Sequence, residues 1–462
     1  MTVNKYNIYI SMVLALALCM AQVVGSSILI LGILGIYLAF LGWSCTNNFT
    51  MPLLLFFLPW STIMRLSPSS YSFYTFGMIL ICGISLVRQK FILKSYHLII
   101  GILIVLLTLL AKLLDGSSLS FDYIAFIMLI VLFPVVKEEW KTKRYDYFQM
   151  VLFFSIGVVM AALCAKAFAT SHNISKYITV HSYLTITRMC GFYGDPNFYT
   201  AQITAALSGT LLMMLLERKK GRFITLAVVT ALLIYCGFLS GSKSFVLVTG
   251  LILMLWLIEL ARIKGRAGLK VLIVLMGIVL SWYITTSTIF SDLIQVLVTR
   301  LSATKDMSSF TTGRTELWAS YFDALFRDPK LLLLGKGFTN VKINDRASHN
   351  TLIQLVFQFG VIGFPLLLTW IICFFRDSER NPSSRKDRIG LWILLIGSFL
   401  PWMAIDALFF DEFFLLQMYV FLGVQQLRFP ERHIESNHIG KSRSASLNRR
   451  RIQYERTRIH SR

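Results

Sequence analysis

The class of fold is indicated most clearly by one apolar stretch, Ser95-Tyr-His-Leu-Ile-Ile-Gly-Ile-Leu-Ile-Val-Leu-Leu-Thr-Leu-Leu-Ala-Lys-Leu-Leu114. Its one permanently charged side chain is Lys112, close to its end. An α-helix needs about twenty mostly apolar residues to cross the hydrocarbon core of a bilayer. The sequence therefore predicts a membrane-spanning helix over residues 95–114.

Similar apolar runs recur along the whole chain. Hydrophobic residues make up 56% of the 462 and charged residues 15%, a balance that a soluble domain of this length would not show. We predict about fourteen spans, near 8–25, 27–43, 50–66, 71–87, 95–114, 119–136, 147–169, 199–216, 223–239, 244–261, 269–289, 350–375, 389–406 and 412–427. The first two and the last two are the weakest, so the expected number is twelve to fourteen. The predicted fold is an all-α polytopic transmembrane helix bundle, with residues 1–427 as one membrane domain.

The first run lacks a small-residue cleavage site and is followed at once by another apolar run, so we expect it to be retained as a span. The net charge of +22 is concentrated in clusters that fall on one side of these predicted spans. The clusters are Arg88–Lys94, Lys137–Arg144, Arg218–Arg222, Arg262–Lys270, Arg376–Arg388 and the tail 428–462. The positive-inside rule makes that side cytoplasmic and places both termini there.

The basic tail is expected to contact anionic lipid head groups, because ten Lys/Arg stand there against three Glu. It offers no aromatic platform for bases, so we expect no nucleic-acid partner. The opposite, extracytoplasmic side receives two long segments, 170–198 and 290–349, together with the connections Ser240–Lys243 and Ala407–Asp411. Segment 290–349 is too rich in aromatic and apolar residues to be typical of disorder, so we expect a partly helical functional loop.

Asp195-Pro196-Asn197 has the pattern of a helix start, with a side-chain cap followed by a proline at the first helical position. Simple capping would explain these residues. The alternative is that the exposed amides of this helix start form an anion site together with Arg188.

Two further cations lie on the outer side. Lys243 stands in Ser240-Gly-Ser-Lys-Ser244, where it would either snorkel to the membrane surface or face a phosphate. Arg314 shares a predicted helical face with Leu317 and Trp318, next to the membrane. A planar guanidinium there is suited to bidentate phosphate binding, although a surface arginine is ordinarily just solvated.

His349 precedes Asn350 where an apolar run begins. A histidine in this position is commonly a hydrogen-bonded or capping residue. A helix amino terminus also disfavours the imidazolium form, which would keep the ring neutral and able to accept a proton. Walker-type loops, GxSxG elbows, His-x-x-x-His pairs and an outer Asp-x-Asp are all missing from the sequence. Asp411-Glu412 is expected to cap a helix or pair with an arginine, which leaves cations and one base as the candidate chemistry.

These residues resemble the O-antigen ligase and O-antigen (Wzy-type) polymerase superfamily of bacterial membrane glycosyltransferases. The likeness covers roughly residues 185–370. Its motifs are Arg188…Gly191…Gly194-Asp-Pro-Asn197, Ser240-Gly-Ser-Lys243, Thr312-Gly-Arg314…Trp318, Leu334-Gly-Lys-Gly337 and His349-Asn350…Phe359-Gly-Val-Ile-Gly363. The chain has Lys243 where the family usually has arginine, and lysine binds phosphate as a point charge.

The resemblance implies a GT-C-like membrane enzyme in the bacterial inner membrane, with its active site on the outer face. The donor would be an undecaprenyl-pyrophosphate-linked glycan, transferred to a glycan acceptor without metal or other cofactor. Arg188 and Arg314 would grip the pyrophosphate, His349 would act as base, and Lys243, Asp195, Asn197 and Asn350 would help to bind substrate. Other polysaccharide-assembly proteins are further candidate partners.

Three readings stay open at this point. A polymerase joins repeat units to one another, whereas a ligase moves the finished chain to another carrier, and no acceptor motif separates the two; the polymerase is our preferred interpretation. A transporter or lipid-linked-sugar flippase is the alternative of another class. Transporters are commonly built from two similar halves, and we find no such repeat, because the long outer loops are confined to the second half of the chain.

Overall fold

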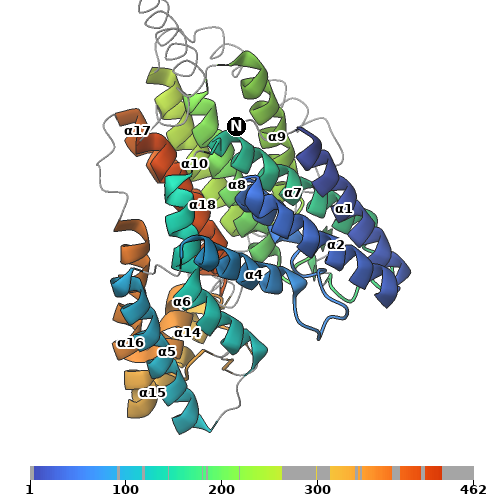
Figure 1. Cartoon of the computed structure of the whole chain (residues 1–462). Coiled ribbons are helices and arrows are strands. Elements are labelled where there is room, and N and C mark those ends of the chain that lie inside the picture. Colours follow the sequence, from blue (N-terminus) through green and yellow to red (C-terminus); the bar gives the residue numbers. More distant parts are fainter. Residues whose placement is uncertain are drawn as a thin grey trace, which may run out of the picture.

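The computed structural model describes residues 5–90, 94–116, 120–143, 145–178, 181–183, 186–217, 219–262, 298, 313–338, 342–343, 346–376, 385–406 and 411–428. It is a membrane helix bundle, as predicted from the apolar runs (Figure 1). Within these ranges, nine helices are long and apolar enough to cross a membrane. Large apolar side chains such as Ile28, Leu113 and Ile224 stay exposed on its outside, as expected for a surface that faces lipid.

The helices follow the predicted runs closely. The first half of the chain forms α1 (Lys5–Val24), α2 (Ser27–Thr46), α3 (Thr50–Phe57), α4 (Phe73–Arg88), α5 (Ser95–Asp115), α6 (Phe121–Thr142) and α7 (Tyr147–Ala167). The second half forms α8 (Pro196–Leu216), α9 (Lys220–Phe238), α10 (Lys243–Arg262), α14 (Arg314–Arg327), α15 (Pro329–Leu334), α16 (Thr351–Arg376), α17 (Arg385–Phe399) and α18 (Glu412–Arg428). The predicted span 269–289 and the predicted tail lie outside the described residues.

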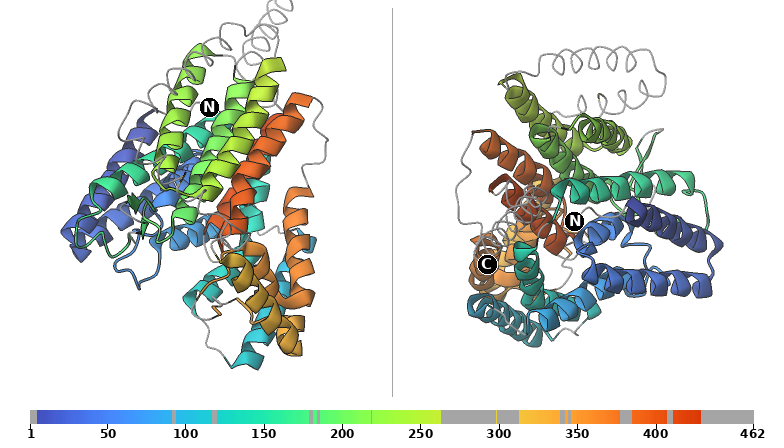
Figure 2. Two further views of the ribbon diagram at one scale, coloured as in Figure 1. Left: turned by 180° about the vertical axis from the view of Figure 1, so that it is seen from behind. Right: turned by 45° about the horizontal axis from the view of Figure 1, so that its top comes forward.

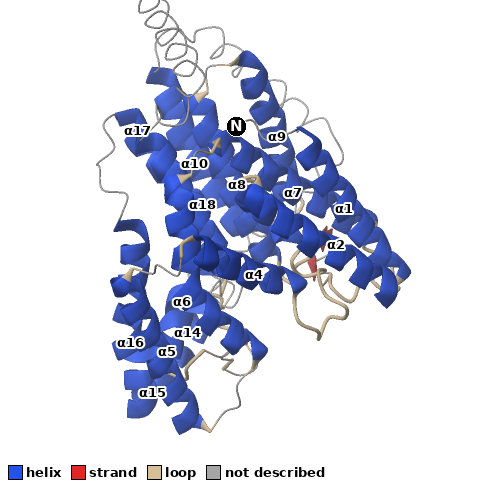
Figure 3. Ribbon diagram, in the orientation of Figure 1, coloured by secondary structure: helices blue, strands red, loops and turns tan. Residues whose placement is uncertain are grey.

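Three segments differ from the predicted spans or from a purely helical fold. The run 50–66 is helical only as α3 and a short 3-10 turn, η1 (Leu58–Trp60), with Pro59 inside that turn. A second 3-10 turn, η2 (Leu400–Ala404), ends the run 389–406. The outer segment 170–198 contains an antiparallel hairpin, β1 (His181–Tyr183) and β2 (Ile186–Arg188), drawn in red in Figure 3.

Helix α8 is the centre of the bundle and is almost wholly enclosed, with α7, α9, α10 and α17 around it (Figure 2). Two of its buried hydroxyls bond locally, since Thr204 and Ser208 donate to backbone carbonyls three residues earlier. A Cβ on Gly397 of α17 would lie 2.4 Å from the Cβ of Ser208. Small residues therefore let these helices approach closely, as is usual in membranes.

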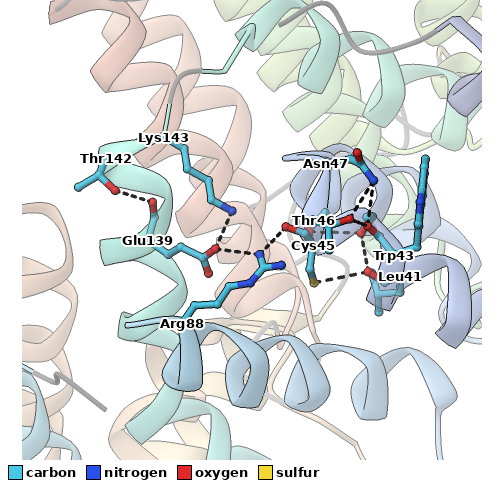
Figure 4. A network of polar contacts seen from close by, with 11 residues as sticks. Leu41, Trp43, Cys45, Thr46, Asn47, Arg88, Glu139, Thr142 and Lys143 are labelled. Carbon is cyan, nitrogen blue, oxygen red and sulfur yellow. Dashed lines mark hydrogen bonds and ion pairs between the residues drawn. The ribbon is translucent and has the colours of Figure 1, made fainter. Parts of the chain in front are cut away.

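Charged residues join the helices at one end of the bundle, which we call the basic end. Arg88 and Lys143 both contact Glu139, at 3.4 and 2.6 Å, and Arg88 also donates to the carbonyl of Cys45 (Figure 4). Arg222 contacts Asp146 at 2.7 Å. Residues from three of the six predicted basic clusters thus lie together, consistent with their predicted placement on one side of the membrane.

Helices α14 and α15 pack on the first half of α16 and form a separate small core. Helix α16 is interrupted at Gly360, whose φ of 61° and ψ of −176° are not helical. The backbone amides of Lys336 and Gly337 donate to the carbonyls of Phe357 and Gln358, at 3.1 and 2.8 Å, directly before this interruption. Figure 1 shows α14, α15, α16 and α5 grouped in the lower part of the bundle.

Glycine is required where this loop meets the break. A Cβ on Gly335 would lie 2.2 Å from the carbonyl oxygen of Gln358, and one on Gly360 would lie 2.3 Å from that of Leu333. Both residues also have positive φ, which side chains disfavour. The absence of a side chain at Gly335 and Gly360 therefore lets the two backbone segments approach closely.

Candidate functional site

Four helices begin near one another at the end of the bundle opposite the basic end, which we call the site end. They are α8, α10, α14 and α16, and the predicted site residues other than Arg188 lie within two residues of their first residues. Helix amino termini present unpaired amides and the positive end of the helix dipole, so their convergence favours an anion.

Asp195 caps α8 as predicted. Its Oδ1 accepts the backbone amide of Asn197 at 2.6 Å, and Pro196 occupies the first helical position. The side-chain oxygen of Asn197 in turn accepts the hydroxyl of Ser242 at 3.1 Å. The start of α8 is therefore tied to the turn that begins α10.

Arg188 and Lys243 meet at that same turn. Arg188, at the end of β2, donates from Nε to the carbonyl of Ser240 at 2.9 Å. Lys243 is the first residue of α10 and is half-buried. A cation at the positive end of a helix dipole does not help the helix, so helix stability does not account for lysine at this position.

Arg314 occupies the equivalent place on α14. Gly313 precedes it with a φ of 74°, a conformation that glycine adopts without strain and that lets the helix begin at once. Trp318, one turn further on, donates its indole N–H to the carbonyl of Ser348 at 2.9 Å. The first turn of α14 is thus fastened to the residue before His349.

His349 faces Asp195. The His349 Nδ1 lies 4.0 Å from the Asp195 Oδ2, and the two side chains are 31% and 26% exposed. This distance is beyond hydrogen-bond length, and the buried Nδ1 has no hydrogen-bond partner within the described ranges. A small rotation of the ring would bring it into reach, as is common for catalytic pairs without substrate.

Burial lowers the pKa of His349 below the ordinary histidine value, and the nearby cations Arg314 and Arg346 lower it further. The carboxylates of Asp195 and Asp406 act in the opposite direction. The direction of the shift agrees with the expectation of a neutral ring, and its largest cause is desolvation of the imidazole. The influence of Arg314 also places that cation near the imidazole.

Asn350 begins α16. Its side-chain oxygen accepts the amides of Leu352 and Ile353, at 3.0 and 3.4 Å. Asn350 is 3% exposed, so the structure gives it a capping role at the site.

Asp406 lies at the centre of the site, although the sequence analysis assigned it only to the end of the run 389–406. Its carboxylate accepts the hydroxyl of Ser348 and the backbone amides of His349 and Asn350. It is 7% exposed. The signal that could have found it is a charge inside an otherwise apolar run, because such a charge is costly without a partner.

The pair Asp411-Glu412 stands at the start of α18, where the carbonyl of Asp411 accepts the amide of Leu415. The Asp411 carboxylate accepts the hydroxyl of Thr75 on α4, at 3.1 Å from each oxygen, and Glu412 accepts the side-chain amide of Gln202 on α8 at 2.6 Å. The side chains of both residues therefore bond to neighbouring helices, and the charge of Arg65 also acts on Asp411. Burial and the neighbouring Glu412 raise the pKa of Asp411 to about 7, which makes it a poor counter-ion for the cations of the site.

The structure thus brings His349, Asp195 and Asn350 together beside Arg314, and it joins Asn197, Arg188 and Lys243 to them through residues 240–243. Residues 290–297 and 299–312 of the predicted functional loop lie outside the described residues. Comparison with known proteins gives no assignment, since no protein-family profile matches the chain and no curated protein matches it.

Proposed function

We propose that the protein is a membrane glycosyltransferase that takes an undecaprenyl-pyrophosphate-linked oligosaccharide as donor and extends a cell-surface polysaccharide, as the O-antigen polymerases do. The proposal rests on one observation: His349, whose pKa is lowered, lies beside a carboxylate and an arginine where four helices begin. This inventory suits a reaction that needs one base and several positive groups.

The acceptor hydroxyl would lose its proton to His349 while its oxygen attacks the anomeric carbon of the donor sugar. The bond between that carbon and the pyrophosphate oxygen breaks, and undecaprenyl pyrophosphate leaves with the electron pair. The leaving group gains one negative charge. Asp195, by facing Nδ1, would stabilise the imidazolium that forms and would leave Nε2 for the acceptor.

Arg314 and Lys243 are placed to receive the growing negative charge, because each stands at the first residue of a helix. The amides of those helix starts add donors of fixed direction, which is the arrangement that stabilises a developing oxyanion. Arg188 would hold the turn 240–243 in place and add a further positive charge. No step in this scheme calls for a metal.

In the proposed orientation the basic end faces the cytoplasm of a bacterium and the site end faces outward, with both chain termini inside. The lipid tail of the donor would lie along the apolar outside of the bundle. The GT-C-like architecture and the partly helical outer loop belong to this proposal, with α14 and α15 as the helical part of that loop.

The test is incubation of the purified protein with a lipid-pyrophosphate oligosaccharide, followed by sizing of the products. A ladder of products supports a polymerase, which is our proposal. A single shifted product on a different acceptor indicates the ligase alternative. Absence of any glycosidic product, with movement of the lipid-linked sugar across a vesicle membrane, would replace the enzyme by a flippase.

A further inference from the structure

We propose that Asp406 is a positioning residue for the base: its carboxylate holds the backbone of residues 348–350 so that the imidazole of His349 faces Asp195. The effect of Asp406 on catalysis depends on the proposed function. Its effect on the backbone of residues 348–350 is argued from the hydrogen bonds alone. It adds the connection between α17 and α18 to a site that the sequence motifs place within residues 185–370.

The three hydrogen bonds of Asp406 are distributed over three consecutive residues. Oδ1 accepts the Ser348 hydroxyl at 2.7 Å and the Asn350 amide at 3.2 Å. Oδ2 accepts the His349 amide at 3.3 Å. A carboxylate that accepts several donors in this way fixes the path of the chain that carries them.

The chain needs fixing here because His349 has a φ of 48°. Residues other than glycine rarely adopt this left-handed conformation, and they keep it only where the surroundings enforce it. The hydrogen bonds to Asp406 help to enforce this conformation. Two further bonds hold the neighbouring residues: Trp318 donates to the carbonyl of Ser348, and Thr351 donates its hydroxyl to the carbonyl of Ile405 at 2.6 Å.

Asp406 is distinguished from Asp195 by what it touches. Its described hydrogen bonds go to backbone amides and to the Ser348 hydroxyl, whereas Asp195 faces the ring itself. Asp195 would therefore act on the ring directly, whereas Asp406, whose charge also raises the pKa of His349, would hold the backbone that carries the ring. The two carboxylates are expected to respond differently to substitution.

Asp406→Asn is the decisive variant, because it keeps the size of the side chain but puts an N–H₂ group where an acceptor is needed. We expect kcat to fall by about a hundredfold with the KM for the lipid-linked donor nearly unchanged, since misplacing a reacting group by about 1 Å has an effect of that order. Ser348→Ala removes one of the three bonds and should give a smaller loss of kcat in the same direction.

Glu412→Gln is the matched control, because Glu412 is also buried at the site end but bonds to Gln202 instead. It should leave the ratio of kcat to KM close to that of the wild type. An equal loss in Glu412→Gln and Asp406→Asn would overturn the proposal, because both would then report general damage to the site end.

A second readout does not depend on turnover. The His349 signal in a nuclear magnetic resonance spectrum of histidine-labelled protein in nanodiscs is identified by its loss in His349→Gln. We expect its chemical shift and its titration to change in Asp406→Asn and, less, in Ser348→Ala, but not in Glu412→Gln. An unchanged His349 signal in Asp406→Asn refutes the positioning role even if the protein transfers no sugar. If Asp406→Asn does not fold, the Ser348→Ala variant decides in the same way.

Discussion

The two ends of the bundle use their carboxylates in different ways. At the basic end Glu139 contacts Arg88 of a neighbouring helix and Lys143 one turn further along its own chain segment, and Asp146 contacts Arg222. At the site end the described hydrogen bonds of the acids come from backbone amides, hydroxyls and a side-chain amide instead. Asp195 caps α8, and Asp406 holds residues 348–350.

This difference indicates that the carboxylates at the basic end hold helices together, whereas those at the site end position the candidate functional residues. Ion pairs between helix ends fix how the helices meet, and their charge is balanced within the protein. Carboxylates that accept amides and hydroxyls fix loops and helix starts, while Arg314 and Lys243 remain at the positive ends of helices where an anion is favoured. Substitutions at the basic end should therefore change stability, and substitutions at the site end should change turnover.

The largest effect is expected for His349→Ala. Loss of the general base should lower kcat by about 10²- to 10⁴-fold, measured with a lipid-pyrophosphate oligosaccharide, with normal insertion into the membrane. His172→Ala is the matched control, because His172 is an exposed histidine of the other outer segment, 170–198. Full polysaccharide assembly in cells that carry His349→Ala would refute the role of the base.

Arg314→Ala should follow, with kcat lower by about 10²- to 10³-fold, because a positioned group that stabilises the leaving charge is lost. Arg327→Ala tests the same helix at its other end, where Arg327 forms an exposed ion pair with Asp323. That control should keep nearly full activity. Arg314→Lys should recover only part of the loss, since lysine keeps the charge but not the fork. Equal activity of the two alanine variants would contradict the assignment.

Asp195→Asn should change the pH dependence of the reaction. Because the pKa of His349 is below the ordinary value, kcat/KM of the wild type should fall only at pH values below the histidine reference of about 6.5. Removing the negative charge of Asp195 favours the neutral imidazole, so this acid limb should move to still lower pH. Asparagine remains a good cap for α8, so stability should change little. If the acid limb of the pH profile keeps its position or shifts to higher pH in Asp195→Asn, then Asp195 does not face the base.

Glu139→Gln should have the opposite pattern. It breaks the contacts with Arg88 and Lys143, and we expect a loss of about 1–3 kcal/mol in the free energy of unfolding, between the values for exposed and buried pairs. Thermal or denaturant unfolding in detergent measures this. Turnover per folded molecule should equal that of the wild type, and a selective loss of kcat would erase the distinction between the two ends.

The smallest effect is expected for EDTA. Cations of the protein itself carry the proposed reaction, so chelation of divalent ions should leave the activity of the purified enzyme largely unchanged. The measurement is product formation with and without EDTA, and with Mg²⁺ added back. A strict requirement for the added metal would point to a different mechanism.

Much of the fold was predictable because apolar runs of span length leave a helix few alternatives. The run 95–114 is found as Ser95–Asp115, and the Asp195-Pro196 start of α8 is found with the capping bond that the pattern indicates. The glycines of Leu334-Gly-Lys-Gly337 were also informative, since the close contact of Gly335 with α16 and of Gly337 with α5 needs residues without a side chain. These features depend on neighbours in sequence or on size alone.

The rest depends on contacts between distant segments. Asp406 has no motif around it, and its role exists only because the α17–α18 connection meets residues 348–350. The approach of Asp195 to His349 and the left-handed backbone of His349 are likewise tertiary facts. The hairpin at 181–188 was missed because two three-residue strands carry too little pattern to stand out from a polar loop.

The interruption at Gly360 divides α16 into two helical segments. Residues 351–359 pack with α14 and α15, while the part beyond Gly360 includes Trp370, which bonds to the carbonyl of Ile130 on α6. At the break, the amides of Lys336 and Gly337 donate to the carbonyls of Phe357 and Gln358. The direction in which the start of α16 presents His349 is therefore set by α14, α15 and the contact of Thr351 with Ile405, in addition to the rest of α16.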